Sequence, residues 1–320
     1  MIERIRHLTT TRMHVPVLLK EVISYLDPQP NENFVDGTFG EGGHSLAILE
    51  NTSPAGKILG IETDKEMCAR WLARKFQIPK SPSTPSSGPR GKFQRVILVN
   101  DNFVNLKKVV KEKKFGPISG VLLDLGISSW HLEESQKGFS FLRNEFLMMR
   151  LDGDKSKLTA ASIINHWPAA ELERIFREYG EERFASKMAA AICSLRNRKP
   201  IETTWQLAEI IKRILPPAYE GGRIHPATRV FLALRIAVNR ELENLERTLP
   251  QILEVLNKGG KICVITFNSL EDRIVKNFFK EQAREGRSKI LTPKPVTPGL
   301  VEIKNNPRSR SAKLRAAAKV

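Results

Sequence analysis

The chain predicts an α/β fold in which helices cover both faces of a doubly wound parallel sheet. Its first half contains short runs that are apolar throughout, which is typical of strands buried on both faces. Segments with helical periodicity alternate with these runs, and strand–helix alternation is the pattern of a parallel sheet. The predicted strands are 33–37, 57–62, 95–100, 120–126 and 259–267.

Helices are predicted after the first two strands, at 43–51 and 64–76. Residues 79–91, PKSPSTPSSGPRG, are rich in Pro, Ser and Gly and predict a flexible surface insertion. From residue 136 to about 222 the pattern is helical, with no strand-like run. One long helix is then predicted over 226–249, ahead of the last strand.

This order predicts a helical domain inserted into the sheet domain. The three parts are 1–135, the first part of the sheet domain; 136–224, the inserted helical domain; and 225–320, the second part of the sheet domain with a basic C-terminal tail.

The charge favours a polyanion as partner. The 320 residues carry a net charge of +17, and the sequence pI is about 9.9. From Arg284 to Val320 there are ten Lys or Arg residues against two Glu residues. This stretch predicts a basic arm that lies on phosphates, and a merely solvated tail is the alternative.

The composition argues against a membrane span and against zinc. The mean hydropathy is −0.30, and no apolar run approaches 18 residues. The three cysteines, Cys68, Cys193 and Cys263, are far apart in apolar surroundings. They predict reduced thiols in a cytoplasmic protein, with no metal site.

The segment NFVDGTFGEGGHS, residues 33–45, predicts a cofactor site. Glycines let the backbone approach a ligand closely, and the following helix supplies free N–H groups. Dinucleotides use such a loop with the spacing GxGxxG, and S-adenosylmethionine (SAM) uses a similar one. The spacing D-G-x-x-G-x-G-G leaves both classes open. Glu62, at the next strand end, could accept the ribose hydroxyls of either cofactor.

Residues 253–267, LEVLNKGGKICVITF, favour SAM. The order of a helix end, L-x-x-G-G and a strand is frequent before the fifth strand of methyltransferase sheets. The two glycines alone are also compatible with an ordinary helix C-cap. Together with the first loop and Glu62, this order fits a class I methyltransferase better than a dehydrogenase.

Eight stretches, in order, resemble one family. They are HVPVLLKEV (14–22), FVDGTFGEGGHS (34–45), GVLLDLGISS (120–129), KGFSF (137–141), YGEERFA (179–185), HPATRVFLALRIAVNREL (225–242), SLEDRIVK (269–276) and NPRSRSAKLR (306–315). With them the chain resembles the RsmH (MraW) family, methyltransferases of small-subunit (16S) rRNA that act on cytosine N4. The resemblance implies a class I SAM-dependent (Rossmann-like) sheet with an inserted helical domain, and a decoding-centre cytidine as the substrate.

The resemblance also implies site residues. The SAM contacts fall on Gly42, Gly43, His44, Glu62, Phe103, Asp124 and His131. Arg235 and Asn239, on the helix predicted over 226–249, are expected to meet RNA.

The chain departs from the family pattern at several positions. Near the cofactor, Glu62 stands where Asp is usual and His131 where Gln is usual. On the side expected to meet substrate, the departures are Lys137 for Arg, Met148 for Asp, Leu232 for Gln and Asn268 for His.

The expected reaction places two demands on the site. Methyl transfer is an in-line displacement that needs the methyl donor and the nitrogen about 3–3.5 Å apart. Cytosine N4 is a poor nucleophile because its lone pair is delocalised into the ring, so acceptors for its hydrogens would help. Backbone carbonyls and a side chain from residues 124–129 are the candidates for this role, with Asp124 as the candidate side chain. Orienting the cofactor is the favoured role for Asp124 itself. Trp130, Phe139 and Phe141 are candidates for stacking on a flipped base, or are ordinary core aromatics.

Three functions are compatible with these features. The first is an active rRNA cytosine-N4 methyltransferase that acts on small-subunit rRNA or a 30S particle. The second is a catalytically degenerate family member that binds rRNA during ribosome assembly, and a dehydrogenase is a distant third. A cytoplasmic location is expected, no membrane is expected as a partner, and a homodimer stays open.

Overall fold

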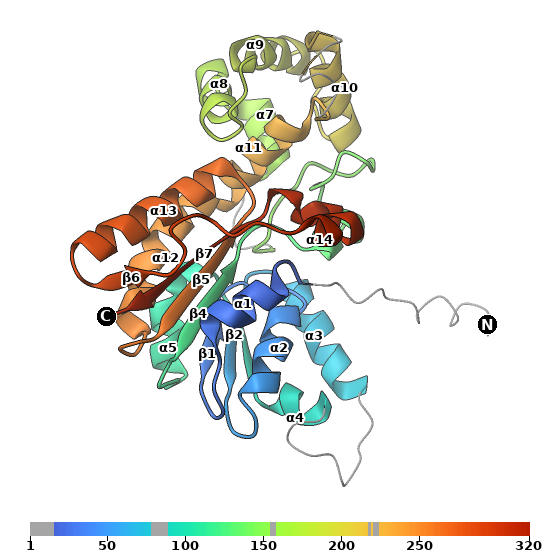
Figure 1. Cartoon of the computed structure of the whole chain (residues 1–320). Helices are drawn as coiled ribbons and strands as arrows, with labels where there is room; N and C mark the ends of the chain where they lie inside the picture. The colour runs from blue at the N-terminus through green and yellow to red at the C-terminus, as the bar shows by residue number, and fades with distance from the viewer. Residues whose placement is uncertain (1–15, 78–88, 154–157, 217–218, 220–223) are drawn as a thin grey trace, which may run out of the picture.

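The computed structural model describes residues 16–77, 89–153, 158–216, 219 and 224–320. Within them a seven-stranded sheet has the order β3-β2-β1-β4-β5-β7-β6 (Figure 1). The strands are β1 (Phe34–Asp36), β2 (Ile58–Glu62), β3 (Val96–Asn100), β4 (Gly120–Asp124), β5 (Lys261–Thr266), β6 (Ser288–Ile290) and β7 (Lys313–Lys319). Strands β1 to β5 pair in parallel, and β7 runs antiparallel to β5 and β6. The five predicted strands and the α/β fold are confirmed.

Helices cover both faces of this sheet. The helices are α1 (Leu19–Leu26), α2 (Gly43–Asn51), α3 (Lys65–Gln77), α4 (Pro89–Gln94), α5 (Leu106–Glu112), α6 (Ser129–Glu133), α7 (Ala160–His166), α8 (Ala169–Glu178), α9 (Ala185–Arg196), α10 (Thr204–Ile214), α11 (Thr228–Asn239), α12 (Glu241–Val255), α13 (Ser269–Arg284) and α14 (Leu300–Asn305). Two short 3₁₀ helices, η2 (Phe103–Asn105) and η4 (Pro307–Ser311), also occur.

Alternating side chains along each strand build two cores, one on each face. Val35 and Val121 pack on one face with residues of α5, α12 and α13. Their neighbours Phe34 and Leu122 pack on the other face with residues of α1, α2 and α4. The strands are therefore apolar throughout because both of their faces are buried.

A third core lies in the helical body formed by α7 to α10, at one end of the sheet (Figure 1). This core also includes five residues of α11, which are Val230, Phe231, Ala233, Leu234 and Val238. Helix α12 instead packs Leu245, Leu249 and Ile252 against the sheet. Helices α11 and α12 therefore connect the two bodies, while the domain boundaries at 136 and 224 stay predictions.

The prediction of a single long helix over 226–249 is wrong. The chain breaks at Arg240, whose φ of +51° is left-handed, and α11 and α12 lie on either side of it. The backbone N–H of Arg240 caps α11 by donating to the carbonyl of Ile236. No glycine or proline marks this break, so the uninterrupted helical pattern gave no sign of it.

The basic tail predicted as an arm on phosphates is also corrected. Residues Lys313–Lys319 form β7, between β5 and β6, and Arg315 is buried there. Its guanidinium binds the carboxylate of Asp272 on α13, with Nε 2.6 Å from Oδ1. Leu314, Ala316 and Ala317 supply enough buried apolar surface to seat the segment in the sheet, despite the flanking charges.

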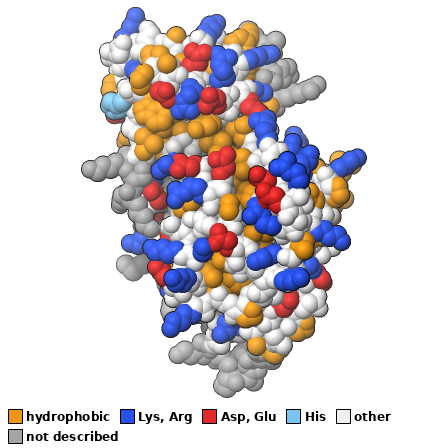
Figure 2. Space-filling model, turned by 90° about the vertical axis from the view of Figure 1, so that its left-hand side faces the viewer, with side chains coloured by type: hydrophobic (Ala, Val, Ile, Leu, Met, Phe, Trp, Pro, Cys, Tyr) orange, Lys and Arg blue, Asp and Glu red, His pale blue; other side chains and the backbone are white. Residues whose placement is uncertain are grey.

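Positive charge is instead spread over the surface. Figure 2 shows Lys and Arg side chains over both the helical body and the sheet body, with Asp and Glu among them. Residues 78–88, which hold most of the predicted surface insertion, lie outside the described part of the chain. Among the described residues, no helix is both long and apolar enough to cross a membrane.

The topology places a crevice beside β1. In the sheet, β2 lies on one side of β1, and β4 lies on the other side. The strand order therefore reverses at β1. In doubly wound sheets, ligands bind outside the carboxyl ends of the strands at such a switch point. The ends of β1, β2 and β4 are therefore where the candidate site is sought.

Candidate functional site

The loop between β1 and α2 is held in place by contacts with both neighbouring strands. The N–H of Gly37 donates to the carbonyl of Leu122 in β4, and the N–H of Phe39 donates to that of Ile61 in β2. Gly42 adopts a φ of +75°, and a Cβ added there would lie 2.7 Å from the Trp71 ring. Glycine is therefore required at this position for both its backbone conformation and its size.

Two side chains at the end of β1 fix the start of this loop. Asp36 is buried, and its carboxylate accepts hydrogen bonds from the Ser45 hydroxyl at 2.6 Å and the Thr38 N–H at 3.2 Å. Burial raises the pKa of Asp36 above its ordinary value. The Thr38 hydroxyl oxygen accepts from the N–H of Asp124 at 2.6 Å, which joins the loop to the end of β4.

Glu62 ends β2 and faces the same loop. Its Oε2 accepts from the N–H of Gly40, and its Oε1 accepts from the N–H of Asp64, both at 2.8 Å. Burial raises the pKa of Glu62 even though both hydrogen bonds favour the ionised form. Each carboxylate oxygen has a second lone pair, so the group can still accept two hydroxyls from a ligand.

His44 and Asp124 face each other across the mouth of the loop. His44 Nε2 lies 3.5 Å from Asp124 Oδ2. Both ring nitrogens of His44 and the Oδ1 atom of Asp124 are buried. None of these atoms has a hydrogen-bond partner among the described residues. Buried polar atoms rarely stay unsatisfied, so this pair indicates a polar ligand at the end of β4.

A cavity of about 420 Å³ lies at these strand ends. Of the predicted cofactor residues, Gly43, His44, Glu62, Phe103, Asp124 and His131 line it. Gly42 does not line it, and a Cβ added at this position of the loop would meet Trp71 and Phe39. The volume is in the range of small-molecule sites. A carboxylate for ribose hydroxyls, an aromatic ring and an unsatisfied polar pair fit SAM, although the individual contacts stay predictions.

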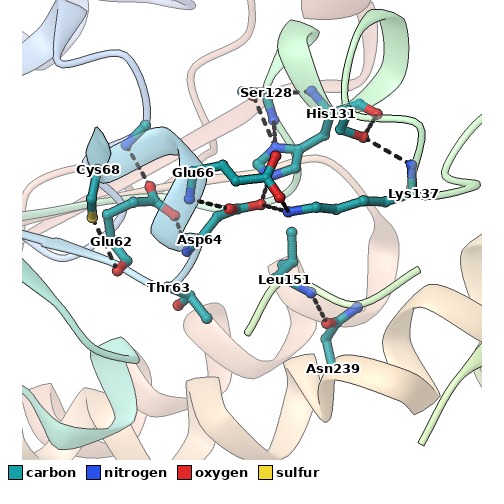
Figure 3. Close-up of polar contacts among 12 residues, drawn as sticks. Glu62, Thr63, Asp64, Glu66, Cys68, Ser128, His131, Lys137, Leu151 and Asn239 are labelled. Atoms are coloured by element: carbon teal, nitrogen blue, oxygen red, sulfur yellow. Dashed lines mark hydrogen bonds and ion pairs between the residues drawn. The ribbon is translucent and has the colours of Figure 1, made fainter. Parts of the chain in front are cut away.

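His131 belongs to a buried polar network behind this cavity (Figure 3). Its Nδ1 accepts from the N–H of Ser128 at 3.2 Å, so Nε2 carries the proton and donates to Asp64 Oδ2 at 3.0 Å. Lys137 Nζ donates to the same oxygen at 2.5 Å. Burial opposes the ionisation of Asp64, but the hydrogen bonds from His131 and Lys137 hold its pKa below the ordinary value.

The two predicted RNA contacts are engaged within the protein. Arg235 binds the Glu241 carboxylate with Nε and Nη2, at 2.8 and 2.9 Å, and neither Arg235 nor Asn239 lines the cavity. Asn239 accepts from the N–H of Leu151 at 3.0 Å (Figure 3). Its side-chain amide also donates to the carbonyl of Met149 at 2.8 Å. Leu151 does line the cavity, so Asn239 supports its wall from behind.

The aromatic candidates lie outside the cavity lining, and another aromatic lies in it. Trp130 and Phe139 are buried, and Phe141 stacks on His225 with ring centroids 4.2 Å apart. Phe267, directly after β5, lines the cavity beside Gly126 and was missed by the sequence analysis. Its place at a strand end next to the predicted site could have identified it.

The remaining departures from the family pattern lie outside the cavity lining. Met148 is exposed and Leu232 is half-buried on α11. Asn268 is the N-cap of α13, and its side-chain oxygen accepts from the N–H groups of Leu270 and Glu271. Among the described residues, no group of three His, Cys, Asp or Glu side chains is placed to hold a metal ion.

Comparison with known proteins gives consistent matches. A family model described as the MraW methylase family matches residues 11–320. The ribosomal RNA small subunit methyltransferase H of Heliobacterium mobile is 43% identical, over 96% of this chain and 99% of that protein. The protein of the same name from Persephonella marina is also 43% identical, with the same coverage. A solved structure from Streptococcus mutans, in complex with S-adenosylhomocysteine (SAH), matches with 11% sequence identity and a TM-score of 0.45. The match covers 96% of this chain and 100% of that one.

Gly42→Ala should destabilise the chain and weaken cofactor binding. The added Cβ meets Trp71 and also strains a left-handed backbone, so we expect a loss of about 1–3 kcal/mol in the free energy of unfolding. Gly259→Ala is the matched control, because Gly259 has a φ of +78° with nothing within 4 Å of the added Cβ. Urea unfolding and calorimetry with S-adenosylhomocysteine measure both effects. Equal losses in the two variants would contradict the steric argument.

Glu271→Gln should change the pH dependence of stability. Burial raises the pKa of Glu271 from 4.5 to about 7. A carboxyl whose pKa is raised in the folded state stabilises it at low pH, and this stabilisation is lost as pH rises through about 7. Relative to Glu271→Gln, the wild type should therefore lose about 2–3 kcal/mol of unfolding free energy between about pH 5 and about pH 8.

Urea unfolding at several pH values measures this loss. Glu254→Gln serves as the control, because Glu254 is an exposed carboxylate paired with Lys107. The unfolding free energy of Glu254→Gln should follow that of the wild type across the pH range. Parallel stability curves for the wild type and Glu271→Gln would show that Glu271 does not titrate in this range.

Proposed function

Because the chain belongs to the MraW methylase family, we propose that it methylates the N4 amino group of a decoding-centre cytidine in small-subunit (16S) rRNA. The chain is a SAM-dependent methyltransferase. The observation that carries the proposal is the identity of more than 40% to proteins named ribosomal RNA small subunit methyltransferase H, over nearly the whole of both chains. The cytidine and its N4 atom come from the resemblance of the sequence motifs.

Different residues of the cavity are assigned to the cofactor and to the acceptor. When bound, SAM supplies an electrophilic methyl group on a sulfonium. Glu62 would accept the ribose hydroxyls, and the loop with Gly43 and His44 would face the methionine part. Phe103 supplies an aromatic surface for the adenine. These residues come from three strand ends that the sheet brings to one edge.

Asp124 is the favoured candidate for binding the acceptor amino group. Its Oδ1 is buried without a hydrogen-bond partner, which suits an acceptor for an N4 hydrogen. Such a hydrogen bond would strengthen as positive charge develops on the nitrogen. The alternative role, orienting the cofactor, is supported by the contact of Asp124 with His44. Phe267 also lines the cavity, and we propose its ring as the surface on which a flipped base could stack.

The charge distribution supports an RNA partner. The net charge of +17 and the Lys and Arg side chains on the face in Figure 2 suit the RNA backbone. Both naked rRNA and a 30S particle present such a backbone, so both stay predicted substrates. The cytoplasmic location and the homodimer stay predictions.

The proposed function is tested by methyl transfer to small-subunit particles that lack the modification. Labelled methyl from SAM should appear in N4-methylcytidine after digestion to nucleosides, and naked rRNA assayed in parallel identifies the form of the substrate. Label in another nucleoside would overturn the cytosine-N4 assignment. Absence of label, with S-adenosylhomocysteine still bound, would favour a catalytically degenerate RNA-binding member.

Asp124→Asn should lower kcat/KM by about 100-fold, because it removes a charged acceptor at the strand end. If Asp124 binds the amino group, kcat falls while the Kd for S-adenosylhomocysteine changes little; if it orients the cofactor, this Kd rises. Asp101→Asn is the control, because Asp101 follows another strand of the same sheet, β3, without lining the cavity. Full turnover by Asp124→Asn would exclude both roles.

A further inference from the structure

We propose that Asp64 is a positioning residue that couples the cofactor wall of the cavity to the wall that faces the acceptor. Asp64 does not line the cavity, and it was not among the residues expected at the site. It lies two residues beyond the end of β2, and its side chain is 1% exposed. The inference rests on the proposed function only in its assignment of the two walls.

The backbone of Asp64 acts on the cofactor wall. Its N–H donates to Glu62 Oε1 at 2.8 Å, while the N–H of Gly40 donates to Oε2. These two hydrogen bonds fix the rotation of the carboxylate that would bind the ribose. Asp64 can hold this backbone position because its own Oδ1 accepts from the N–H of Glu66, in the first turn of α3.

The side chain of Asp64 acts on a different part of the cavity. Its Oδ2 accepts from both His131 and Lys137, at 3.0 and 2.5 Å (Figure 3). His131 lines the cavity from α6, and its hydrogen bond to Ser128 fixes the other side of the ring. The ring is therefore held between two partners and presents a fixed edge to the cavity.

Lys137 extends the network to the segment 149–151, of which Leu151 lines the cavity. The carbonyl of Lys137 accepts from the N–H of Met149 at 2.7 Å, and Asn239 binds both the Met149 carbonyl and the Leu151 N–H. One buried carboxylate thus connects Glu62, His131 and, through Lys137, the segment that carries Leu151.

Asp64→Asn isolates this role because it keeps the shape of the side chain. Asp64 accepts on both oxygens, whereas the amide of Asn would place an N–H₂ group against either the Glu66 N–H or the His131 and Lys137 donors. A donor facing buried donors forces one of them to move. We expect the Kd for S-adenosylhomocysteine and the KM values for SAM and for the small-subunit particle to rise about tenfold or more.

Asp272→Asn is the matched control. Asp272 is another carboxylate that binds two cationic side chains, Arg315 and Lys313, but it joins α13 to β7 away from the cavity. Its loss should lower the unfolding temperature while the Kd for S-adenosylhomocysteine stays within about twofold. If the ion pairs of Asp64 were merely structural, Asp64→Asn would likewise lower the unfolding temperature and leave the Kd for S-adenosylhomocysteine within about twofold.

A pair of variants at Lys137 keeps the proposal falsifiable if Asp64→Asn does not fold. Lys137→Arg retains the cation, so the Kd should remain near that of the wild type, whereas Lys137→Met removes it and should raise the Kd about tenfold. Isothermal calorimetry on the full chain measures each variant.

Unchanged affinity in Asp64→Asn, or equal losses in Lys137→Arg and Lys137→Met, would overturn the proposal. A wild-type chain that binds S-adenosylhomocysteine but methylates a different base would overturn the proposed function and leave this inference standing.

Discussion

The N–H groups of Gly40 and Asp64 hold the carboxylate of Glu62 at the end of β2, and the rest of the cavity is arranged around this contact. It requires the glycine loop to lie against β2, which in turn requires Gly42 to take a left-handed conformation over the Trp71 ring. The loop can reach both β2 and β4 because β1 lies between them in the sheet. The topology therefore brings together residues separated by more than 80 positions in the sequence.

Three carboxylates near this contact, those of Asp36, Glu62 and Asp64, differ in their surroundings. Asp36 and Glu62 accept hydrogen bonds from neutral donors, and burial dominates to raise the pKa of each. Asp64 also binds a lysine, and its pKa is lowered. A lowered pKa suits a fixed support, because the ionised carboxylate of Asp64 attracts its donors, which include the cation of Lys137. Glu62 suits a ligand site for a different reason, because each of its two oxygens accepts one backbone hydrogen bond and has a lone pair left for a hydroxyl.

Much of the sheet could be predicted from the sequence, because each strand buried on both faces leaves an uninterrupted apolar run. The break at Arg240 could not, because a non-glycine residue takes the left-handed conformation and no local signal marks it. Strand β7 was hidden for a related reason, since Lys313, Arg315 and Lys319 made an inserted strand resemble a solvated tail. In the site, Glu62 and Asp124 lie at strand ends that pattern and resemblance identified. Phe267 also follows a strand end, but no motif singled it out, and Asp64 is tied to His131 and Lys137 only by tertiary contacts.

Charge in this chain has two different uses, and only the structure separates them. Arg235 and Arg315 are largely buried and bind carboxylates, so they join elements of the fold rather than extend a basic surface. A buried ion pair contributes little net stability relative to an apolar pair, but losing one partner is costly. The sequence charge therefore overstates the cations that can reach a polyanion. An RNA surface must be sought among the exposed Lys and Arg side chains, and the counterion release measured on binding would count only those.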